Sequence, residues 1–521
     1  MDKIISREWI PNDSKFYAVS DSFNSKVQEF SKEQLCVIID YYKNKLVDAG
    51  VEPGQKIGIG FASTDISYTA IIFAAAELGL KLVVLNTLTS LRLIKSAKCS
   101  AHMPLDVFVY YQYRNTHLDQ LLRNIKYYIN NSKKVIQIDT NWSSESINSI
   151  PRIPLYAKPE NDLLLCSSSG TTGAPKLIHH NQEYLYDLAK YNWEPLELNE
   201  NDSVYHFSSL NHGASLSVFF LPAVNKCKKH YFDLPTELRS QIDHEKNFVF
   251  QACKLCNITV ILSPNNNITD GIIEAIQDSE DGLPNTTIIV LTFINPRWLN
   301  VVKSGKLKKI ISAFGCSEAG GPILLPYIDK NTDINSFDPK FLGKPLEGFF
   351  KTNVVDGMLT VNLPNGNTVE TEDIIKETEN GYYFVRKNKL KKINDIDINP
   401  LDIIGLLETY CSRSRFEIVI EEVYNKLYIV TDNQTMIDYE DDIKKIIKNF
   451  YDGEVNLTAV IFMPNFSDAI VSIKPDRDIL LDYIRERDYF MGSVDGLPNI
   501  PRKAVETFFK TINEEIKKIN K

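Results

Sequence analysis

One segment of the chain combines the residue types that bind polyphosphate. Residues 163–176 read LLLCSSSGTTGAPK, in which an apolar strand leads into hydroxyl residues, two glycines and Lys176. Glycine lets the backbone turn close to a ligand, hydroxyls and exposed N–H groups donate hydrogen bonds, and lysine adds positive charge. The pattern GxxxxGK[ST] is absent, so this is not a Walker A loop. The segment predicts another kind of loop that binds the phosphates of a nucleotide.

A second segment, far downstream, places a carboxylate close to an aromatic ring. It reads Phe314-Gly315-Cys316-Ser317-Glu318. Taken in order, the two segments resemble signatures of the adenylate-forming superfamily, [ST]SG[ST]TGxPK after a strand and [YF]Gx[ST]E farther on. This superfamily comprises the AMP-forming acyl- and aryl-CoA ligases, nonribosomal adenylation domains and luciferases. With weaker matches at 74–86, 210–215, 257–264 and 342–349, the resemblance spans residues 30–485.

The resemblance implies roles in ATP binding for both segments. The β- and γ-phosphates would be bound by the loop residues Ser168, Ser169, Gly170, Thr171, Thr172, Gly173 and Lys176. Thr171 or Thr172 with Glu318 would place Mg²⁺. Phe314 would lie against adenine, beside Gly315 and Ser317. A carboxylate that attacks the α-phosphorus brings two anions together, so the charges of the metal and of Lys176 would offset their repulsion. Lys176 and Glu318 are therefore predicted catalytic residues.

The family's ribose-binding motifs, TGD and GR, have altered counterparts in this chain. Asp373 and Arg386 are present, but the two glycines are replaced by Glu372 and Val385. The hinge position is Asn388. A further family glycine, in a loop beside the pantetheine tunnel of acyl-CoA ligases, corresponds to Asp395, which bears on thioester formation more than on adenylation.

Two segments compete for the family's C-terminal catalytic lysine, which contacts the α-phosphate and the substrate carboxylate. Lys474 stands in IKPDRDIL and Lys503 in GLPNIPRKAVETF. Lys474 lies 86 residues after Asn388 and Lys503 lies 115 after it. A C-terminal domain of typical size favours the shorter count, so we assign the role to Lys474 and keep Lys503 as the alternative.

The resemblance also implies an acid pocket and a range of acyl acceptors. The pocket would be lined by Phe207, His212, Gly213, Leu291, Thr292, Ala313, Ala319 and Gly320, with His212 also a candidate catalytic residue. Amino-acid-activating relatives usually carry an aspartate where this chain has Gly213, which favours an acyl or aryl acid over an α-amino acid. Because no DSL-type carrier segment follows, the acceptor is expected to be coenzyme A, a separate phosphopantetheinyl carrier protein or an amine.

The elements that must position these residues follow from the pattern of apolar runs. Buried-strand runs at 56–61, 81–85, 135–138, 259–262 and 287–291 alternate with helical patterns, which predicts parallel βαβ units. From Thr352 short alternating stretches with turn signals predict antiparallel strands. The expected fold is α/β. It has a large N-terminal domain of layered α/β subdomains plus a distorted β-barrel (1–387), a small mobile α+β C-terminal lid (388–488), and an extension with an amphipathic helix (489–521).

Composition narrows the partners of the 521-residue chain. Its net charge of −9 argues against a broad basic face for nucleic acid. The N-terminus lacks a secretory apolar core, and residues 68–86 read as a helix and a strand rather than a membrane span. The eight scattered cysteines favour a reducing cytoplasm. The pair Cys253 and Cys256 reads as a buried helix face rather than a zinc or redox site.

The leading hypothesis is therefore an Mg²⁺-dependent, AMP-forming ligase. It would convert a carboxylic acid and ATP into an acyl-adenylate and pyrophosphate, then transfer the acyl group to a thiol or an amine. The alternative is a noncatalytic nucleotide- or acid-binding relative, since several family glycines are replaced. A nucleotide-hydrolysing switch protein is disfavoured by the missing Walker A motif.

Overall fold

The chain forms two compact units, Met1–Asn388 and Lys389–Lys521. The computed structural model describes residues 3–19, 28–60, 66–85, 104–111, 119–138, 150–167, 177–208, 213–233, 242–263, 266–333, 336–346, 348–387, 390–408, 416–431, 434–463, 470–471, 474–475, 480–481 and 483–485. Among these residues, no helix combines the length and apolarity needed to cross a membrane.

The first unit contains a six-stranded sheet in the order β6-β5-β3-β4-β7-β8. Its strands are β3 (Lys56–Ile59), β4 (Lys81–Val83), β5 (Leu105–Tyr111), β6 (Ser132–Ile138), β7 (Asp162–Ser167) and β8 (Leu177–Asn181). All neighbours are parallel except β8, which runs antiparallel to β7. Helices of this region are α1 (Lys32–Asp48), α2 (Ile66–Glu77), α5 (Asp119–Asn130) and α6 (Gln182–Tyr191). Parallel strands joined through helices confirm the predicted βαβ pattern.

A second sheet of the same unit has eight strands in the order β16-β13-β12-β11-β9-β10-β1-β2. They are β1 (Lys15–Val19), β2 (Gln28–Ser31), β9 (Ser203–Tyr205), β10 (Lys229–Asp233), β11 (Val260–Ser263), β12 (Leu283–Val290), β13 (Leu307–Ser312) and β16 (Tyr327–Asp329). The six central strands are parallel, and the edge strands β2 and β16 are antiparallel. Strands β9 and β11 are buried along their full length, as expected for a sheet covered on both faces.

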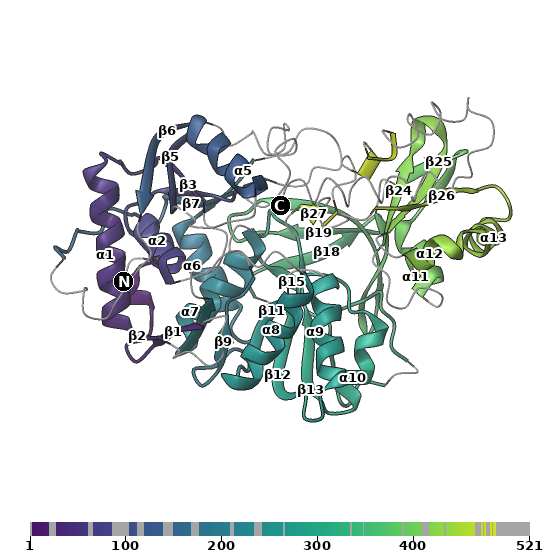
Figure 1. Ribbon diagram of the computed structural model, residues 1–521, viewed down its shortest axis with the longest axis horizontal. Coiled ribbons are helices and arrows are strands. Elements are labelled where there is room, and N and C mark those ends of the chain that lie inside the picture. Colours follow the sequence, from purple (N-terminus) through teal and green to yellow (C-terminus); the bar gives the residue numbers. More distant parts are fainter. Residues whose placement is uncertain are drawn as a thin grey trace. The chain divides into compact units, whose positions relative to one another are not determined.

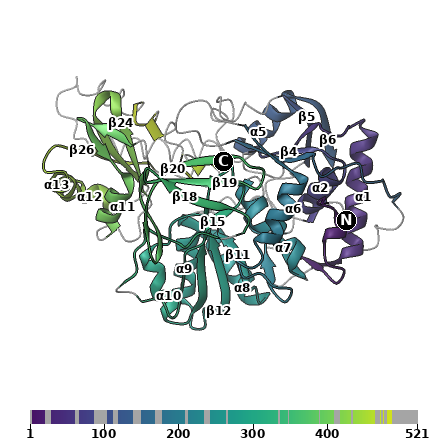
Figure 2. The same cartoon turned by 180° about the vertical axis from the view of Figure 1, so that it is seen from behind.

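Helices pack against the parallel strands of this second sheet. They are η2 (Ser215–Phe220, a π-helix), α7 (Leu221–Lys226), α8 (Ile242–Leu255), α9 (Asn266–Asp278) and α10 (Leu299–Lys303), with the short 3₁₀ turn η3 (Pro296–Trp298). A second 3₁₀ turn, η1 (Arg7–Trp9), lies near the N-terminus. Helices α8, α9 and α10 lie alongside β11, β12 and β13 (Figure 1), and Figure 2 shows the same strands from behind. Cys253 is buried on α8, which agrees with the reading of this cysteine as part of a helix face.

The remaining strands of the first unit are antiparallel. A five-stranded sheet in the order β17-β21-β20-β19-β18 occupies the place predicted for the distorted barrel. Its strands are β17 (Phe341–Gly343), β18 (Lys351–Val355), β19 (Met358–Asn362), β20 (Thr368–Thr378) and β21 (Gly381–Lys387). A separate pair joins β14 (Phe314–Gly315) and β15 (Pro322–Leu324). The turn between these two short strands contains Glu318.

The second unit is a small α+β body built on the three-stranded sheet β24-β25-β26. Its elements are β22 (Lys391–Ile393), β23 (Ile396–Ile398), α11 (Pro400–Glu408), β24 (Phe416–Glu421), η4 (Glu422–Tyr424), β25 (Lys426–Thr431), α12 (Gln434–Asp438), α13 (Glu440–Phe450), β26 (Leu457–Phe462), β27 (Ile470–Val471) and β28 (Lys474–Pro475). Along β25, Leu427 and Ile429 pack in one apolar cluster, whereas Tyr428 and Val430 pack in another. The strand alternation therefore buries both faces of this sheet.

A buried ion network joins the N-terminal segment to α1 and α2. Arg7 donates hydrogen bonds to both carboxylate oxygens of Asp40, at 2.7 and 2.8 Å, and to Glu77 at 2.7 and 2.8 Å. Lys43 donates to Glu77 at 2.7 Å and to the carbonyl oxygen of Ile153 at 2.8 Å. Because two cations face two carboxylates, the charges of the network balance, and all four side chains are buried.

A second buried polar pair lies between β9 and β10. His206 Nε2 and His230 Nδ1 are 3.2 Å apart, and His230 Nε2 is 3.0 Å from the carbonyl oxygen of Cys227. The carbonyl can only accept, so His230 carries its proton on Nε2 and accepts a hydrogen bond from His206. Burial lowers the pKa of His230 to about 4, and burial together with the neighbouring His230 lowers the pKa of His206. Both rings are neutral in the folded protein.

Candidate active site

The predicted phosphate loop connects two strands whose ends lie side by side. Residues 168–176 themselves, which include Ser168, Ser169, Gly170, Thr171, Thr172, Gly173 and Lys176, lie outside the described residues. Strand β7 ends next to the start of β8, with Ser167 opposite Leu177 and Cys166 opposite Ile178. The loop therefore leaves and re-enters the sheet at one place.

Glu318 and Gly213 both come close to the end of β7. Burial and, to a smaller extent, the negative charge of Glu318 raise the pKa of the Cys166 thiol to about 12. A Cβ atom on Gly213 would lie 3.4 Å from the Cβ of Cys166. Cys166 thus lies where the strand before the phosphate loop meets the segment after His212. Ser217 joins that segment to the Glu318 turn through the carbonyl oxygens of Gly213 and Gly320. His212 itself lies outside the described residues, but its flanks are joined by a 3.1 Å contact between the hydroxyls of Ser208 and Ser215.

The Glu318 turn is closed by its own backbone. The N–H of Gly320 lies 3.1 Å from the carbonyl oxygens of Cys316 and Ser317, which leaves Glu318 at the tip of the turn. Gly320 has φ of 64°, in the left-handed region that favours glycine. At Gly315 a Cβ atom would come within 2.3 Å of the Gly321 carbonyl oxygen, so this close approach also requires glycine.

Asp373 lies in the same electrostatic neighbourhood as Glu318. Burial, with smaller contributions from the carboxylates of Glu318 and Asp373, raises the pKa of the Cys316 thiol to about 12. Two of the predicted nucleotide-binding carboxylates therefore lie close enough to one thiol to act on it. Asp373 is buried on β20 and forms an ion pair with Lys387.

The side chain of Arg386 starts from a different face of the β20–β21 hairpin than that of Asp373. The register pairs Asp373 with Lys387 and Ile374 with Arg386, so the side chains of Asp373 and Arg386 start from opposite faces of the hairpin. Arg386 donates a 3.1 Å hydrogen bond to the carbonyl oxygen of Lys387. The predicted hinge, Asn388, lies outside the described residues.

The residues that stand in place of the family glycines have two kinds of backbone conformation. Glu372 has φ of 61° and Asp395 has φ of 64°, both in the left-handed region. Asp395 forms, with Asn394 at φ of 50°, the two-residue turn between β22 and β23, which needs positive φ at both positions. Val385 differs, because it is the extra residue at a register shift between β20 and β21 and is not among the residues with positive φ.

Four of the eight residues predicted for the acid pocket follow the ends of parallel strands. Phe207 comes after β9, Leu291 and Thr292 come directly after β12, and Ala313 comes directly after β13. The carboxyl ends of parallel strands meet at one edge of a sheet, where ligands of α/β proteins bind. The described pocket residues are therefore gathered at one edge, with Ala319 and Gly320 in the neighbouring Glu318 turn.

Phe293 belongs to an aromatic group beside the predicted adenine contact. Its ring centroid is 6.1 Å from that of Phe314 and 5.2 Å from that of Phe384 on β21. The three rings link the segment after β12, strand β14 and strand β21 of the antiparallel sheet. Phe293 thus places a ring against Phe314 at the end of β12.

Three side chains that sequence reasoning missed hold the Glu318 turn. His180 Nε2 is 2.9 Å from the carbonyl oxygen of Ser317, and Tyr184 Oη donates to the carbonyl oxygen of Ala319 at 2.7 Å. Ser217 Oγ lies within hydrogen-bonding distance of the carbonyl oxygens of Gly320 and, at 2.9 Å, of Gly213. We call His180, Tyr184 and Ser217 the clamp residues. They lie more than 100 positions from the turn, so no local pattern connects them to it.

Lys474, the favoured catalytic lysine, forms β28 with Pro475 and pairs with Val471 of β27 in the second unit. The alternative, Lys503, and the predicted terminal helix lie outside the described residues.

The described residues fit Mg²⁺ that is bound together with ATP. They contain no group of three or more His, Cys, Asp and Glu side chains able to hold a metal by themselves. Mg²⁺ usually binds through one or two carboxylates together with substrate phosphates, rather than in a cage made only of protein. A single half-buried carboxylate, Glu318, beside the ends of a phosphate loop suits this arrangement.

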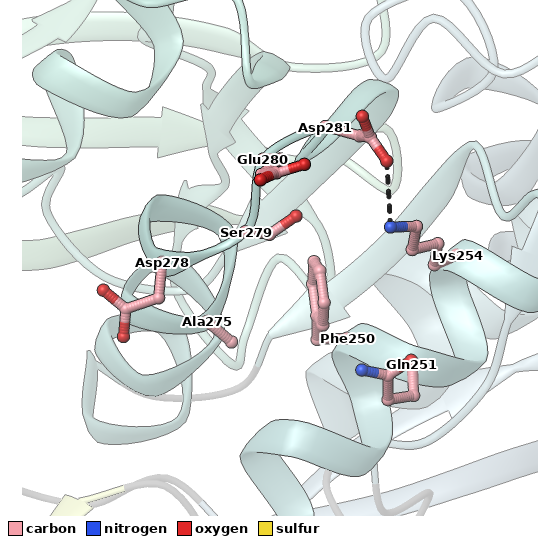
Figure 3. A pocket seen from close by; sticks show the side chains of 8 residues that line it. All are labelled: Phe250, Gln251, Lys254, Ala275, Asp278, Ser279, Glu280 and Asp281. Carbon is pink, nitrogen blue, oxygen red and sulfur yellow. Dashed lines mark hydrogen bonds and ion pairs between the residues drawn. The ribbon is translucent and has the colours of Figure 1, made fainter.

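A separate depression of about 400 Å³ lies between α8 and α9, away from the residues above (Figure 3). Its lining residues are Phe250, Gln251, Lys254, Ala275, Asp278, Ser279, Glu280 and Asp281. Lys254, the one cationic side chain among these lining residues, forms an ion pair with Asp281 at 3.1 Å. None of the predicted site residues lines this depression, so it is not the candidate active site.

Comparison with known proteins places the chain in a family. The model of the AMP-binding enzyme family matches residues 39–368, more than half of the chain. The chain therefore belongs to the AMP-binding enzymes of the adenylate-forming superfamily. It is an ATP-dependent, AMP-forming acid ligase by class, as the two sequence signatures predicted. A comparison with curated proteins found no match.

Solved structures of adenylate-forming proteins share the fold at low sequence identity. The chain is similar to McyG A-PCP complexed with phenylalanyl-adenylate, at 16% identity and a TM-score of 0.70, covering 93% of this chain and 95% of that one. It is similar to the anthranilate CoA ligase AuaEII in complex with anthranoyl-AMP, at 15% identity and a TM-score of 0.68, covering 93% and 97%. ATP-bound MatB from Rhodopseudomonas palustris matches at 14% identity and a TM-score of 0.68, covering 93% and 99%. These likenesses confirm the predicted fold class.

Proposed function

We propose that the chain adenylates an acyl or aryl carboxylic acid with Mg²⁺ and ATP, and then transfers the acyl group to a thiol or an amine. One observation carries this proposal: Gly213 lies against Cys166 near the end of β7, and Ser217 joins Gly213 to Gly320 in the Glu318 turn through their carbonyl oxygens. This arrangement supports a single site made of the segments that we assign to the phosphate loop, the acid pocket and the metal carboxylate. Adenylation of an acid requires a phosphate-binding loop, an acid pocket and a metal-binding carboxylate at one site.

The reaction proceeds in two steps. In the first, a carboxylate oxygen of the acid attacks the α-phosphorus of ATP, and the bond from that phosphorus to the bridging oxygen breaks to release pyrophosphate. In the second, a thiol or amine attacks the acyl carbon and loses its proton, and the acyl C–O bond breaks to release AMP. Each step moves charge onto phosphate oxygens, which positive charge and N–H donors stabilise.

The site residues divide this work between them. The loop 168–176 binds the β- and γ-phosphates, with Lys176 supplying positive charge. Glu318 and Thr171 or Thr172 hold Mg²⁺, which supplies charge neutralisation for the departing pyrophosphate. Asp373 and Arg386 are assigned to the ribose, which they would approach from opposite faces of the hairpin. Phe314, beside Gly315 and Ser317, lies against adenine. Lys474 contacts the α-phosphate and the acid during adenylation, and the second unit turns about Asn388 between the two steps.

The acid pocket favours a plain acid over an α-amino acid. Leu291, Thr292, Ala313 and Phe207 are uncharged and lie at the ends of adjoining strands. An aspartate in place of Gly213 would pair with an α-ammonium group, but glycine offers no carboxylate for that pairing. The missing carboxylate supports an uncharged substrate tail.

The acceptor is a thiol of coenzyme A, a thiol of a separate carrier protein, or an amine. A left-handed turn is present at Asp395, where acyl-CoA ligases have the glycine beside their pantetheine tunnel. This backbone supports a thiol acceptor, because the turn has the conformation that a glycine would give it.

Carboxylate-dependent ATP–pyrophosphate exchange tests the proposal. The wild-type chain and Glu318→Gln are assayed with a panel of aryl, fatty, short-chain and amino acids, with Glu183→Gln as a control on an exposed carboxylate. We expect exchange with an aryl or acyl acid, unchanged in the control and reduced roughly 100-fold or more in Glu318→Gln. ATP binding without exchange for any acid would instead support the noncatalytic alternative.

A further inference from the structure

The carbonyl groups on both sides of Glu318 are held by side chains that no predicted motif contains. His180, Tyr184 and Ser217 reach the carbonyl oxygens of Ser317, Ala319 and Gly320. Among residues 317–320, the clamp residues contact every carbonyl oxygen except that of Glu318. Its peptide neighbours are therefore fixed while its own side chain stays half-buried.

The clamp residues come from segments next to the ligand-binding parts. His180 is in β8, which begins at the end of the phosphate loop, and Tyr184 is in the first turn of α6, which follows directly. Asn181 caps α6 by accepting a 2.8 Å hydrogen bond from the N–H of Tyr184. The rings of His180 and Tyr184 stack with centroids 5.3 Å apart. The strand leaving the phosphate loop and the Glu318 turn are thereby joined through two stacked rings.

Ser217 connects the same turn to the acid pocket. Its buried hydroxyl lies between the carbonyl oxygens of Gly213 and Gly320 and has one proton to donate. A change at Gly213, where the acid is proposed to bind, can therefore alter the hydrogen bond to the turn that carries Glu318.

We propose that His180, Tyr184 and Ser217 are positioning residues that set the affinity of Glu318 for the divalent cation and couple it to the phosphate loop and the acid pocket. The inference rests on the proposed function, in which Glu318 binds Mg²⁺. Groups that orient a metal ligand change metal affinity or activity by roughly 10–100-fold when they are removed. The clamp residues act through the backbone of the turn and do not contact the reacting atoms.

Tyr184→Phe tests this with little disturbance, because the ring and its packing are kept. Tyr186→Phe is the matched control, since Tyr186 is on the same helix and its exposed hydroxyl accepts from Lys190 at 2.7 Å. His180→Gln, which keeps an N–H donor, is compared with His180→Phe, which keeps only a ring. His179→Gln is the matched control, because His179 is exposed and contacts Asp162 at 2.9 Å.

Two readouts are measured on each full-length variant. The first is the affinity for Mn²⁺ in the presence of ATP, followed by electron paramagnetic resonance. The second is the Mg²⁺ concentration that gives half-maximal pyrophosphate exchange, together with the KM of the acid and the melting temperature. We expect Tyr184→Phe and His180→Phe to weaken Mn²⁺ binding and raise half-saturating Mg²⁺ roughly tenfold. His180→Gln should recover part of the loss, and the control variants should match wild type.

Several results would overturn the inference. One is unchanged Mn²⁺ affinity in Tyr184→Phe and His180→Phe. Another is a loss that appears equally in the KM of the acid and the melting temperature, which would mark a purely structural role. If the wild type shows no exchange with any acid, the proposed function fails, but the Mn²⁺ comparison still decides whether the clamp residues position a cation-binding carboxylate.

Discussion

The hydroxyl of Tyr184 donates a 2.7 Å hydrogen bond to the carbonyl oxygen of Ala319, the residue that follows Glu318. These two residues are 135 positions apart in the chain. Their contact ties the helix after the phosphate loop to the turn that carries the proposed metal ligand. A movement of the loop's downstream flank therefore reaches Glu318 through one hydrogen bond and the adjoining ring stack.

Restoring a glycine at Glu372 should stabilise the protein. The left-handed backbone of Glu372 strains any residue with a Cβ atom, and glycine removes that strain at some cost in unfolded-state entropy. We expect Glu372→Gly to raise the free energy of unfolding by about 0.5–1 kcal/mol, measured by urea denaturation. Val385→Gly is the contrast, because Val385 lies in a strand and its replacement should destabilise by about 0.5–1 kcal/mol. Equal effects of the two changes would contradict this reading of the backbone.

Removing one charge from the buried network should be costly. Glu77→Gln leaves Arg7 and Lys43 with too little negative charge, and breaking a buried ion pair costs about 3–5 kcal/mol. The control Glu29→Gln, which breaks the exposed pair with Lys15, should change the free energy of unfolding very little. Chemical denaturation of both variants checks this, and equal stability of Glu77→Gln and wild type would contradict it.

The same network predicts how the free energy of unfolding depends on pH. Burial alone would raise the pKa of Glu77, but the hydrogen bonds and charge of Arg7 and the charge of Lys43 hold it below its ordinary value. Because the folded pKa is lowered, this contribution is present above the unfolded pKa of about 4.3 and is lost as the pH falls through the folded pKa. Glu77→Gln should therefore lose less stability than wild type on acidification below that pH.

The buried histidine pair predicts a loss of stability as the pH falls below about 6.5. Unfolded histidine takes up a proton below a pH of about 6.5, whereas His206 and His230 stay neutral when folded. The free energy of unfolding should fall by up to about 1.4 kcal/mol per pH unit for each histidine as the pH drops from 6.5 towards 5. The double variant His206→Phe with His230→Phe should show a flatter profile, and the exposed control His179→Gln should not. Identical slopes in the double variant and wild type would exclude this pair as the cause.

The adenylation lysine can be assigned by comparing two substitutions. Lys474→Ala should lower the rate of pyrophosphate exchange roughly 100–1,000-fold, because a cation next to the α-phosphate is lost. Lys503→Ala should leave the rate unchanged. The opposite result would move the role to Lys503 and make the C-terminal lid longer than 388–488.

The sequence predicted the parts of the protein that are continuous in the chain. The strand runs at 56–61, 81–85 and 287–291 appear as β3, β4 and β12, because short apolar β-branched runs carry their own signal. The two signatures predicted the family, since each holds its glycines, hydroxyls and charges within a few residues. The antiparallel strands after Thr352 were also expected from their turn signals.

The supports of the site were not predictable in this way. His180, Tyr184 and Ser217 act on carbonyl oxygens, which every residue has, so the Glu318 turn shows no complementary side chain in the sequence. The loss of glycine at 372 and 395 suggested altered loops, yet Glu372 and Asp395 keep left-handed backbones. Backbone conformation at these positions is set by the surrounding strand pairing and overrides the residue preference.

The most direct test of adenylation is to follow an oxygen atom of the acid. An acid identified by exchange is labelled with ¹⁸O in its carboxylate and incubated with the full-length chain, ATP and Mg²⁺, with hydroxylamine as the acceptor. The AMP is then examined by mass spectrometry. If the carboxylate attacks the α-phosphorus, one ¹⁸O atom appears in each AMP and the acid is recovered as its hydroxamate. Label in inorganic phosphate with formation of ADP, or AMP without label, would contradict the account.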